Sequence, residues 1–313
     1  MKHLNWQKQL QSHGIEIKRL IPLREWSESR VIRVEGIRCG QPVIYFLKRS
    51  NRNIEIESTI YRFATHHAEF PAPKANVMTV DGEVWLLLNQ APGNRLADIR
   101  EPDTYDAYIS AARSLAKFHM QAAASGWPDR LSVLKPLKDR LKTLPAIVLK
   151  ELRQKLVNGE YTGIDVSLIN LVEAATETQW YRITKEFGRY PDSLIHGDCH
   201  YGNLFLAQTG EMYLIDWSSA SIAPGLMDLT ALADVSQRMN APTPPEPELL
   251  NAYLGEHAKS EREKYGNPLR AWMICHSVRN FLELEWFNST SENYGERIQR
   301  ELINLKRFLV RSE

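Results

Sequence analysis

The feature of the sequence that most constrains its fold is a segment at residues 193–217, in which two short apolar runs flank a polar break. The runs occupy residues 203–207 and 212–215, and the break occupies residues 208–211. Two such runs joined by a short turn that contains glycine are typical of a β-hairpin. The segment therefore predicts a hairpin whose open end lies beside the tripeptide His-Gly-Asp at residues 196–198.

Polar residues at the open end of this hairpin indicate a specific chemistry. A turn symmetric about Thr209 and Gly210 sets Asn203 directly opposite Asp216, with Cβ atoms about 5 Å apart. An amide oxygen and a carboxylate that converge in this way suit Mg²⁺, which keeps several waters and binds phosphate oxygens. Asp198 is placed to take a proton from an incoming hydroxyl, although an isolated aspartate in a turn is usually a cap. Together these residues predict a phosphoryl-transfer site.

The pattern HGD, an asparagine five residues after its aspartate, and Ile-Asp-Trp at the end of the next strand resemble the aminoglycoside phosphotransferase/choline kinase family, which is related to the protein kinases. The resemblance implies that Asp198 is the catalytic base and that Asn203 and Asp216 bind Mg²⁺. It implies ATP, or alternatively GTP, as the phosphate donor. It also implies an α+β, bilobal protein-kinase-like fold, with a small antiparallel sheet and one helix in the N-terminal lobe and a mostly helical C-terminal lobe.

Composition narrows the setting in which such a protein works. The 313 residues are enough for two lobes, and 43% hydrophobic and 25% charged residues are ordinary for a globular protein. A net charge of +1 provides no global field toward nucleic acid or an acidic membrane. The three cysteines form no CxxC pair, which argues against a disulfide framework or structural zinc. No apolar run approaches the ~20 residues of a membrane span, and the N-terminus has no apolar signal region. We therefore expect a cytoplasmic monomer or homodimer that binds neither nucleic acid nor membrane.

A lysine and a glutamate in the N-terminal part are expected to form an ion pair. Strand-like segments at residues 15–23, 31–35 and 42–48 indicate an antiparallel meander, and alternation places Lys48 on an apolar face of the third. In the helix expected next, Glu57 is the one charge on an apolar stripe, and such a charge needs a counter-ion. We therefore predict that Lys48 pairs with Glu57, and Glu55 is the alternative partner. The simpler interpretation is that the lysine and the glutamate are both solvated at the surface. The kinase-like fold implies that Lys48 reaches the nucleotide phosphates.

The loop expected to cover the phosphates, residues 24–30, contains no glycine and so departs from the GxGxxG of protein kinases. Backbone amides of a serine-rich turn can still hold phosphate, which makes Ser27 and Ser29 candidates, although a plain surface turn is equally compatible. A buried strand at residues 84–88 leads to Asn89 and Ala91, where the resemblance implies that backbone groups bind adenine. We expect the boundary here, with a nucleotide-binding lobe at residues 1–92 and a catalytic lobe at residues 93–313.

Several polar residues of the helical part are expected to act in support. The resemblance implies that His196 is structural, with its ring bonded to backbone, and that His200 contacts the transferred phosphoryl group, unless it only stabilises the loop. His119, near the end of a helix at residues 105–122, is expected to pack and form a hydrogen bond. Asp228, in the first turn of a helix at residues 226–239, is expected to interact with the helix dipole or a neighbouring loop.

A helix at residues 268–287 is the candidate for binding the acceptor. His276, Arg279, Asn280, Glu283 and Trp286 fall on one face at helical spacing, which could line a pocket for a hydroxylated or amine-bearing metabolite. A solvated amphipathic face is the simpler interpretation.

Taken together, the sequence predicts transfer of a γ-phosphoryl group to a hydroxyl of a small molecule that is aminoglycoside-, choline-, amino-acid- or sugar-like. A protein Ser/Thr kinase is the first alternative, disfavoured because no activation segment with an APE-like end follows Trp217. A non-catalytic nucleotide-binding scaffold is the second, disfavoured because the base, both metal ligands and the Lys–Glu pair are all present.

Overall fold

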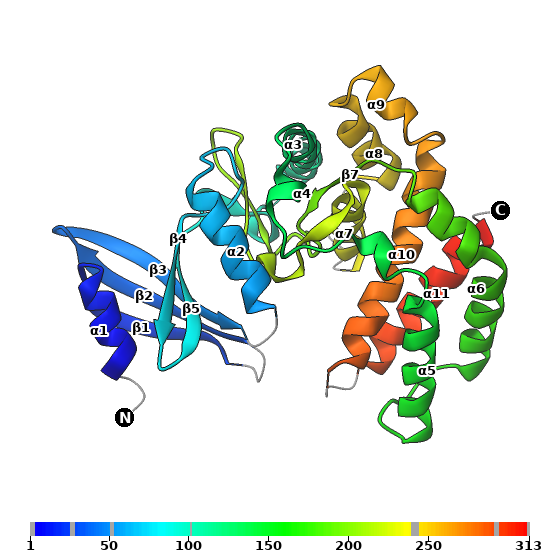
Figure 1. Ribbon diagram of the computed structural model, residues 1–313, viewed down its shortest axis with the longest axis horizontal. Coiled ribbons are helices and arrows are strands. Elements are labelled where there is room, and N and C mark those ends of the chain that lie inside the picture. Colours follow the sequence, from blue (N-terminus) through cyan, green and yellow to red (C-terminus); the bar gives the residue numbers. More distant parts are fainter. Residues whose placement is uncertain are drawn as a thin grey trace.

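The computed structural model describes residues 4–25, 29–50, 53–100, 102–238, 244–290 and 294–311. Figure 1 shows an antiparallel sheet in the N-terminal part, in blue and cyan, and a helical C-terminal part that runs from green to red. The expected α+β architecture, with an antiparallel sheet in the N-terminal part and a mostly helical C-terminal part, is confirmed. The candidate Ser27 lies outside the described residues.

The N-terminal sheet has five antiparallel strands in the order β1-β2-β3-β5-β4. Two of its hairpins close with two-residue turns, Cys39-Gly40 and Asp81-Gly82, in which both residues have positive φ. This conformation matches the twist of the flanking strands and is suited to glycine. The strands are β1 (Ile15–Glu25), β2 (Ser29–Arg38), β3 (Gln41–Ser50), β4 (Ala75–Val80) and β5 (Glu83–Asn89).

Strand β5 is buried on both faces, which explains its continuous apolar run. Trp85 and Leu87 belong to a small core on one face of the sheet, while Leu86 and Leu88 belong to the large core that continues into the helical part. Since neighbouring side chains of a strand point to opposite faces, this one strand connects the two cores.

Two helices accompany the sheet. Helix α1 (Leu4–Ser12) packs on β1 and β4 and contributes Leu10 to the small core, so the N-terminal part has a helix in addition to the one implied by the kinase-like pattern. Helix α2 (Ile54–Thr65) lies between β4 and the short helix η3 (Trp217–Ser219). It therefore places residues of the N-terminal part directly beside the segment that contains Asp216.

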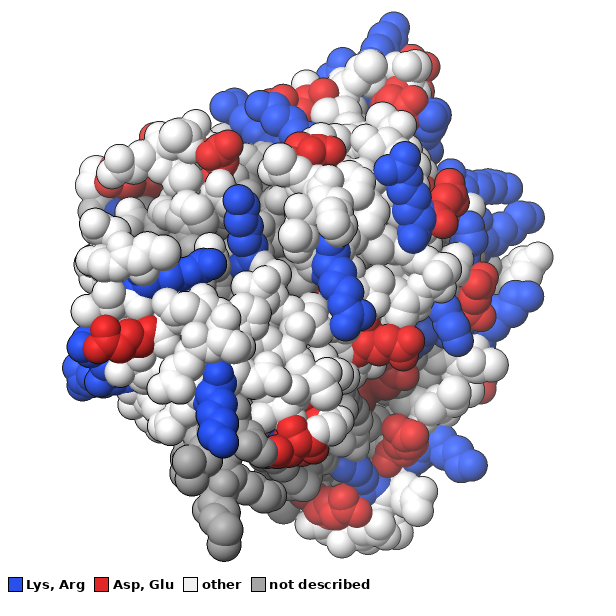
Figure 2. Space-filling view, turned by 60° about the vertical axis from the view of Figure 1, so that its left-hand side comes forward, with Lys and Arg blue, Asp and Glu red and all other residues white. Residues whose placement is uncertain are grey.

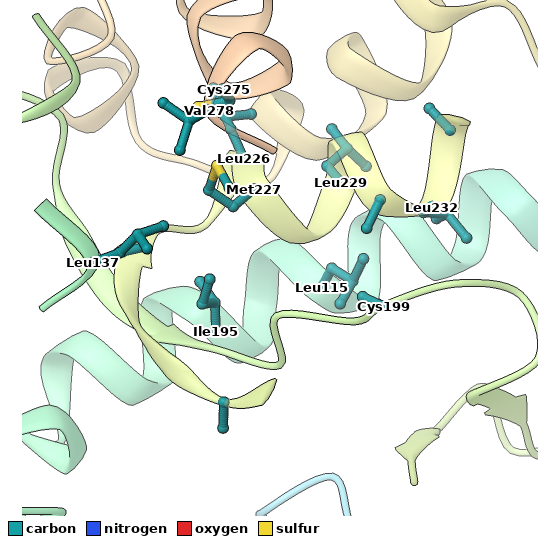
Figure 3. Close-up of a cluster of buried hydrophobic side chains, with 14 of the residues drawn as sticks. Leu115, Leu137, Ile195, Cys199, Leu226, Met227, Leu229, Leu232, Cys275 and Val278 are labelled. Atoms are coloured by element: carbon teal, nitrogen blue, oxygen red, sulfur yellow. The ribbon is translucent and has the colours of Figure 1, made fainter. Parts of the chain in front are cut away.

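The C-terminal part is built from helices with two small sheets. In Figure 3, Leu226, Met227 and Leu229 of α7 lie between Leu115 of α3 and the side chains of α10. The helices are α3 (Thr104–Ala124), α4 (Trp127–Arg130), α5 (Leu144–Val157), α6 (Val166–Phe187), α7 (Leu226–Arg238), α8 (Glu246–Gly255), α9 (Lys259–Glu263), α10 (Pro268–Asn288) and α11 (Gly295–Arg311). The small sheets pair β7 (Asp192–Ile195) with β10 (Ser221–Pro224), and β8 (Leu204–Leu206) with β6 (Asn94–Arg95) and β9 (Met212–Leu214).

Helix α5 begins later than the local sequence pattern suggests. The pattern is helical over residues 137–157, whereas the structure has a 3₁₀ turn, η2 (Leu137–Asp139), followed by α5 from Leu144. Pro145 lies in the first turn of α5. Proline is tolerated there but not in a helix interior, so the helix begins immediately before it.

Charge is mixed over the face in Figure 2, where Lys and Arg side chains alternate with Asp and Glu. Of the helices in the described residues, none combines the length and apolar character that crossing a membrane requires.

Candidate active site

The predicted hairpin is present as β8 and β9, but its register differs from the expectation by one residue. A three-residue loop closes it, and Gly210 at the end of that loop has φ 83°. Loops of this type require a left-handed residue, which glycine supplies at no steric cost. Asn203 is consequently opposite Ile215, whose N–H donates to the Asn203 carbonyl at 3.0 Å, and the predicted direct opposition of Asn203 and Asp216 is wrong.

Asp216 nevertheless faces the site because its own backbone turns. It has φ 67° and ψ 62°, a left-handed conformation that is uncommon for a residue with a side chain. Its Oδ1 accepts hydrogen bonds from Lys48 Nζ at 2.7 Å and from Ser218 Oγ at 2.9 Å. Burial alone would raise the pKa of Asp216, but the Lys48 charge and these hydrogen bonds lower it to about 2. The carboxylate is therefore ionised at neutral pH.

The ion pair between Lys48 and Glu57 is present. Lys48 Nζ donates to Glu57 Oε1 at 2.7 Å and lies equally close to Asp216 Oδ1. Lys48 is 6% exposed and Glu57 is fully buried, so neither is a solvated surface charge. Burial opposes the charge of Lys48, but the two carboxylates outweigh it and raise the pKa of the ammonium. Strand β3, helix α2 and the segment after β9 thus converge on one cation.

Asp198 lies in the loop after β7 and is held by Asn203. The Asn203 Nδ2 donates to the Asp198 carbonyl at 3.0 Å and to its Oδ2 at 3.2 Å. This directs the amide nitrogen of Asn203 toward Asp198 and leaves its Oδ1 for another partner. Loss of solvation at its partly buried position, followed by the negative charges of Glu283 and Asp216, raises the pKa of Asp198, while Arg279 and Asn203 oppose the shift. Because 44% of the side chain is exposed, Asp198 remains accessible to a substrate.

His196 is a structural residue, as expected. Its ring is fully buried, and Nε2 donates to the Ile215 carbonyl at 2.9 Å. In the neutral ring Nδ1 is then the acceptor, and it receives the N–H of Asp198 at 3.3 Å. With both nitrogens used in this way, His196 has no lone pair left for a substrate proton. Gly197 follows with φ 81°, where a Cβ would come within 2.1 Å of the Ser219 carbonyl oxygen.

His200 takes part in the loop's own hydrogen bonding. Its Nδ1 accepts the N–H of Gly202 at 2.9 Å, and its carbonyl accepts the N–H of Asn203 at 2.9 Å. Burial lowers the pKa of His200 to about 4, so its ring is neutral at pH 7. A contact with phosphate through Nε2 remains a prediction.

Asp228 holds the backbone of the same loop through hydrogen bonds. It is fully buried at the start of α7 and accepts the N–H of His196 at 2.7 Å and that of Gly197 at 2.8 Å. His119 Nε2 lies 3.1 Å from the same carboxylate. The expectation of a helix-start carboxylate bonded to a neighbouring loop, and of a hydrogen-bonded His119, is thus confirmed.

The residues expected to contact the nucleotide differ in whether their polar groups are already hydrogen-bonded within the protein. The N–H of Asn89 already donates to the Lys74 carbonyl at 2.9 Å, so that group is used within the sheet. Ala91 is buried in the link that follows. Ser29 begins β2, and its buried hydroxyl has no hydrogen-bond partner among the described residues. A shallow cavity of about 340 Å³ touches Asn89 but none of the residues around Asp198, and therefore does not mark the catalytic centre.

The polar stripe of α10 is divided between two surroundings, so neither a solvated amphipathic face nor a single pocket-lining face describes it. His276 is buried and stacks on Phe308 of α11 with ring centroids 4.6 Å apart, and Asn280 is fully buried. Arg279 and Glu283 form a 2.6 Å ion pair whose two charges both act on Asp198. The stripe is therefore largely interior, and these two residues are the ones that it brings to the catalytic carboxylate.

The oxygen groups of the site suit Mg²⁺ better than a metal held entirely by protein. Among the described residues, no group of three or more His, Cys, Asp or Glu side chains could enclose a metal ion. Asp216 offers an ionised carboxylate, and Asn203 offers an amide oxygen. Mg²⁺ is commonly bound by one or two such oxygens together with phosphates and water, so these residues fit the ion.

Comparison with solved structures identifies the class of fold. The chain is similar to a thermostable mutant of aminoglycoside phosphotransferase APH(4)-Ia, in a ternary complex with ADP and hygromycin B, with TM-score 0.60, 17% identity, and coverage of 96% of this chain and 97% of that one. It is also similar to a Plasmodium vivax ethanolamine kinase, with TM-score 0.62, 13% identity, and coverage of 96% and 86%. A macrolide 2′-phosphotransferase, MphH from Brachybacterium faecium, has TM-score 0.58, 15% identity, and coverage of 94% and 96%. The fold is that of the kinase-like phosphotransferases.

The sequence itself supplies the family. Residues 21–265 match the model of the phosphotransferase enzyme family, which is well over half of the chain. The chain belongs to this family and is a phosphotransferase. None of the curated proteins that were compared matches it.

Proposed function

We propose that this phosphotransferase moves the γ-phosphoryl group of ATP, or of GTP, to a hydroxyl of a small molecule. The observation that carries the proposal is the position of Lys48 Nζ, 2.7 Å from both Glu57 and Asp216, beside a loop in which Asn203 holds Asp198. A solved structure of similar fold contains ADP, which supports a nucleotide donor. These are the parts that phosphoryl transfer requires.

Each residue then has a defined role in the mechanism. Lys48, kept charged by its two carboxylate neighbours, neutralises the nucleotide phosphates. Asn203 and Asp216 would hold Mg²⁺, which would supply positive charge to the phosphate oxygens. Asp198 accepts the proton of the acceptor hydroxyl and orients its oxygen toward the γ-phosphorus. Because Asn203 fixes Asp198, the carboxylate is already positioned when the acceptor arrives.

The link between the sheet and the helical part supports the proposed boundary after residue 92. Gly93 has φ 84°, and a Cβ on it would come within 2.1 Å of the Leu206 carbonyl oxygen in β8. After β5 the chain thus comes into direct backbone contact with the hairpin of β8 and β9, which is called the catalytic hairpin below. We place the nucleotide lobe at residues 1–92 and the lobe with Asp198 and the metal ligands at residues 93–313.

The acceptor is best matched by a hydroxylated molecule that also carries a cation. Glu283 and Asp198 place two carboxylates near the point of transfer, and Arg279 compensates Glu283 from a more buried position. The side chain of Glu283 is 21% exposed, against 6% for Arg279, so the negative member of the pair is the one nearer to solvent. An amine close to the reacting hydroxyl would find a complementary charge here.

A protein substrate has less support. Residues 217–225, between Asp216 and α7, are occupied by η3 and β10, and β10 pairs with β7. This leaves no long segment of the kind that positions a peptide in protein kinases. We further propose a cytoplasmic setting, which the three unpaired cysteines support, and retain monomer or homodimer as the expected state.

The test is transfer of labelled γ-phosphate from ATP or GTP, with Mg²⁺, to a panel of amine-bearing and neutral hydroxyl metabolites, compared with a protein panel. Asp198→Ala should fold normally and lose turnover while nucleotide binding, measured by calorimetry, persists. Transfer to proteins alone would favour the protein kinase alternative. Nucleotide binding without any transfer would favour the scaffold.

A further inference from the structure

The loop that contains Asp198 is connected to helix α8, which packs against α3 and α7, by a continuous series of buried hydrogen bonds. We propose that Tyr253 of α8 and His119 of α3 act together as positioning residues, which hold the backbone immediately before Asp198 in its reactive place. The proposal rests on the proposed function for its kinetic readout only. Its structural readout is independent of any activity.

The contacts form an unbroken path between residues far apart in sequence. Tyr253 Oη lies 2.8 Å from His119 Nδ1, and His119 Nε2 lies 3.1 Å from Asp228 Oδ2. Asp228 in turn accepts the N–H groups of His196 and Gly197 at 2.7 and 2.8 Å. Tyr253 and Asp228 are fully buried, and His119 is 3% exposed. Water therefore has almost no access to replace any of these bonds.

The direction of the path follows from its end at Asp228. Hydrogen bonds from His119 and the His196 amide overcome the effect of burial and lower the pKa of Asp228, so its carboxylate is ionised and only accepts. His119 Nε2 must then be the donor. With Nδ1 of the imidazole as the acceptor, Tyr253 donates its hydroxyl proton to His119, and the Tyr253 hydroxyl also hydrogen-bonds to the side chain of Tyr265. One hydroxyl fixes both the tautomer and the orientation of the imidazole.

The backbone leaves open the space in which this pair meets. Gly225 precedes α7, and a Cβ on it would lie 2.2 Å from Tyr253 Oη and 2.5 Å from His119 Nδ1. Any larger residue at 225 would separate the two groups. A second bond, from Ser193 Oγ to the His119 carbonyl at 2.9 Å, ties the same turn of α3 to β7, the strand that leads into the loop.

These hydrogen bonds are expected to affect catalysis because the two N–H groups that Asp228 accepts belong to His196 and Gly197, the residues directly before Asp198. If Tyr253 is lost, His119 keeps one bond to Asp228 but can rotate, and its buried Nδ1 has no donor. The carboxylate of Asp228 then holds the loop less firmly, and Asp198 samples more positions. A displacement of about 1 Å in a catalytic group can lower the rate on the order of 100-fold.

Two single variants, their double variant and a control test this proposal. Tyr253→Phe removes only the hydroxyl, and His119→Phe replaces the imidazole by a ring that can neither donate to Asp228 nor accept from Tyr253. Tyr161→Phe is the matched control, because it also removes a buried tyrosine hydroxyl, one that donates to the Phe287 carbonyl at 2.9 Å away from the loop. Amide hydrogen exchange of the peptide that spans residues 194–199 is measured for each, together with kcat and the KM of the nucleotide.

We expect Tyr253→Phe and His119→Phe each to speed exchange of the loop amides about tenfold and to lower kcat about 5- to 20-fold, with KM within about twofold. The double variant should be no worse than the more affected single one, because both break the same connection. Unchanged exchange in both variants, or an equal effect of Tyr161→Phe, would overturn the proposal. Faster loop exchange in a protein that shows no transfer at all would support the positioning role and refute the proposed function instead.

Discussion

Replacing Glu57 by Gln tests the buried group around Lys48 most directly. The change keeps the size of the side chain and an oxygen that can accept from Lys48, but removes one negative charge from a fully buried position. Lys48 retains Asp216 at 2.7 Å, so no buried charge is left without a partner. The cost is the difference between a charge-assisted and a neutral hydrogen bond, about 1–2 kcal/mol, or a melting temperature lower by about 2–5 °C.

The effect of this change on activity should be larger than its effect on stability. Lys48 now bonds the carboxylates of both Glu57 and Asp216. When Glu57 loses its charge, the Lys48 ammonium moves away from α2 and toward the carboxylate of Asp216. We expect kcat to fall on the order of 100-fold, because both Lys48 and a proposed metal ligand are displaced.

The assay combines urea unfolding with steady-state phosphotransfer, and the chain offers a matched control. Glu55→Gln makes the same change of charge two residues earlier on α2, where the side chain is exposed. It should alter the free energy of unfolding by less than about 0.5 kcal/mol and leave kcat unchanged. Equal effects of the two substitutions would refute the assignment of Glu57 and show that only the net charge of α2 matters.

Three further substitutions have defined outcomes. Gly197→Ala places a methyl 2.1 Å from the Ser219 carbonyl at a positive φ, so unfolding measurements should show a loss of about 2–4 kcal/mol together with lost turnover. The pKa of Asp228 is lower in the folded than in the unfolded protein, so its contribution to the free energy of unfolding is complete above the unfolded pKa of about 3.9 and is lost as pH falls. Asp228→Asn should therefore lower the free energy of unfolding by about 2–4 kcal/mol at pH 7 and make it less dependent on pH in the acid range. Glu283→Gln should raise the KM of an amine-bearing acceptor at least about tenfold and leave that of a neutral alcohol unchanged, and equal KM shifts for both would contradict the charge match.

The sequence predicts those parts of the site that local patterns determine. A single charge on the apolar stripe of α2 was enough to identify Glu57 as a buried partner of Lys48. The hairpin was recognisable from its apolar runs, but its register depended on whether the loop had two or three residues, and both patterns are compatible with Gly210. The left-handed turn at Asp216, which restores the geometry, is accompanied by a contact with Lys48 of β3 that a local pattern does not contain.

Long-range partners account for the features that the sequence did not reveal. Strand β4 is short and follows a proline-containing stretch, and its strand character depends on pairing with β5. The stripe of α10 looked amphipathic because His276 and Asn280 are polar, yet α11 and the interior cover them. Asp228 was expected to meet a neighbouring loop, but that loop's identity depends on the packing of α7 beneath residues 196–197.

The close approach of Gly93 to Leu206 has a consequence for engineering. Here the connector crosses the catalytic hairpin backbone to backbone, with no room for even a methyl group. A chimera that grafts the sheet of another phosphotransferase onto these helices must therefore join upstream of residue 93 and retain the glycine. A graft that carries any bulkier residue at this crossing would push the donor-side half away from the hairpin, however well its own strands fold.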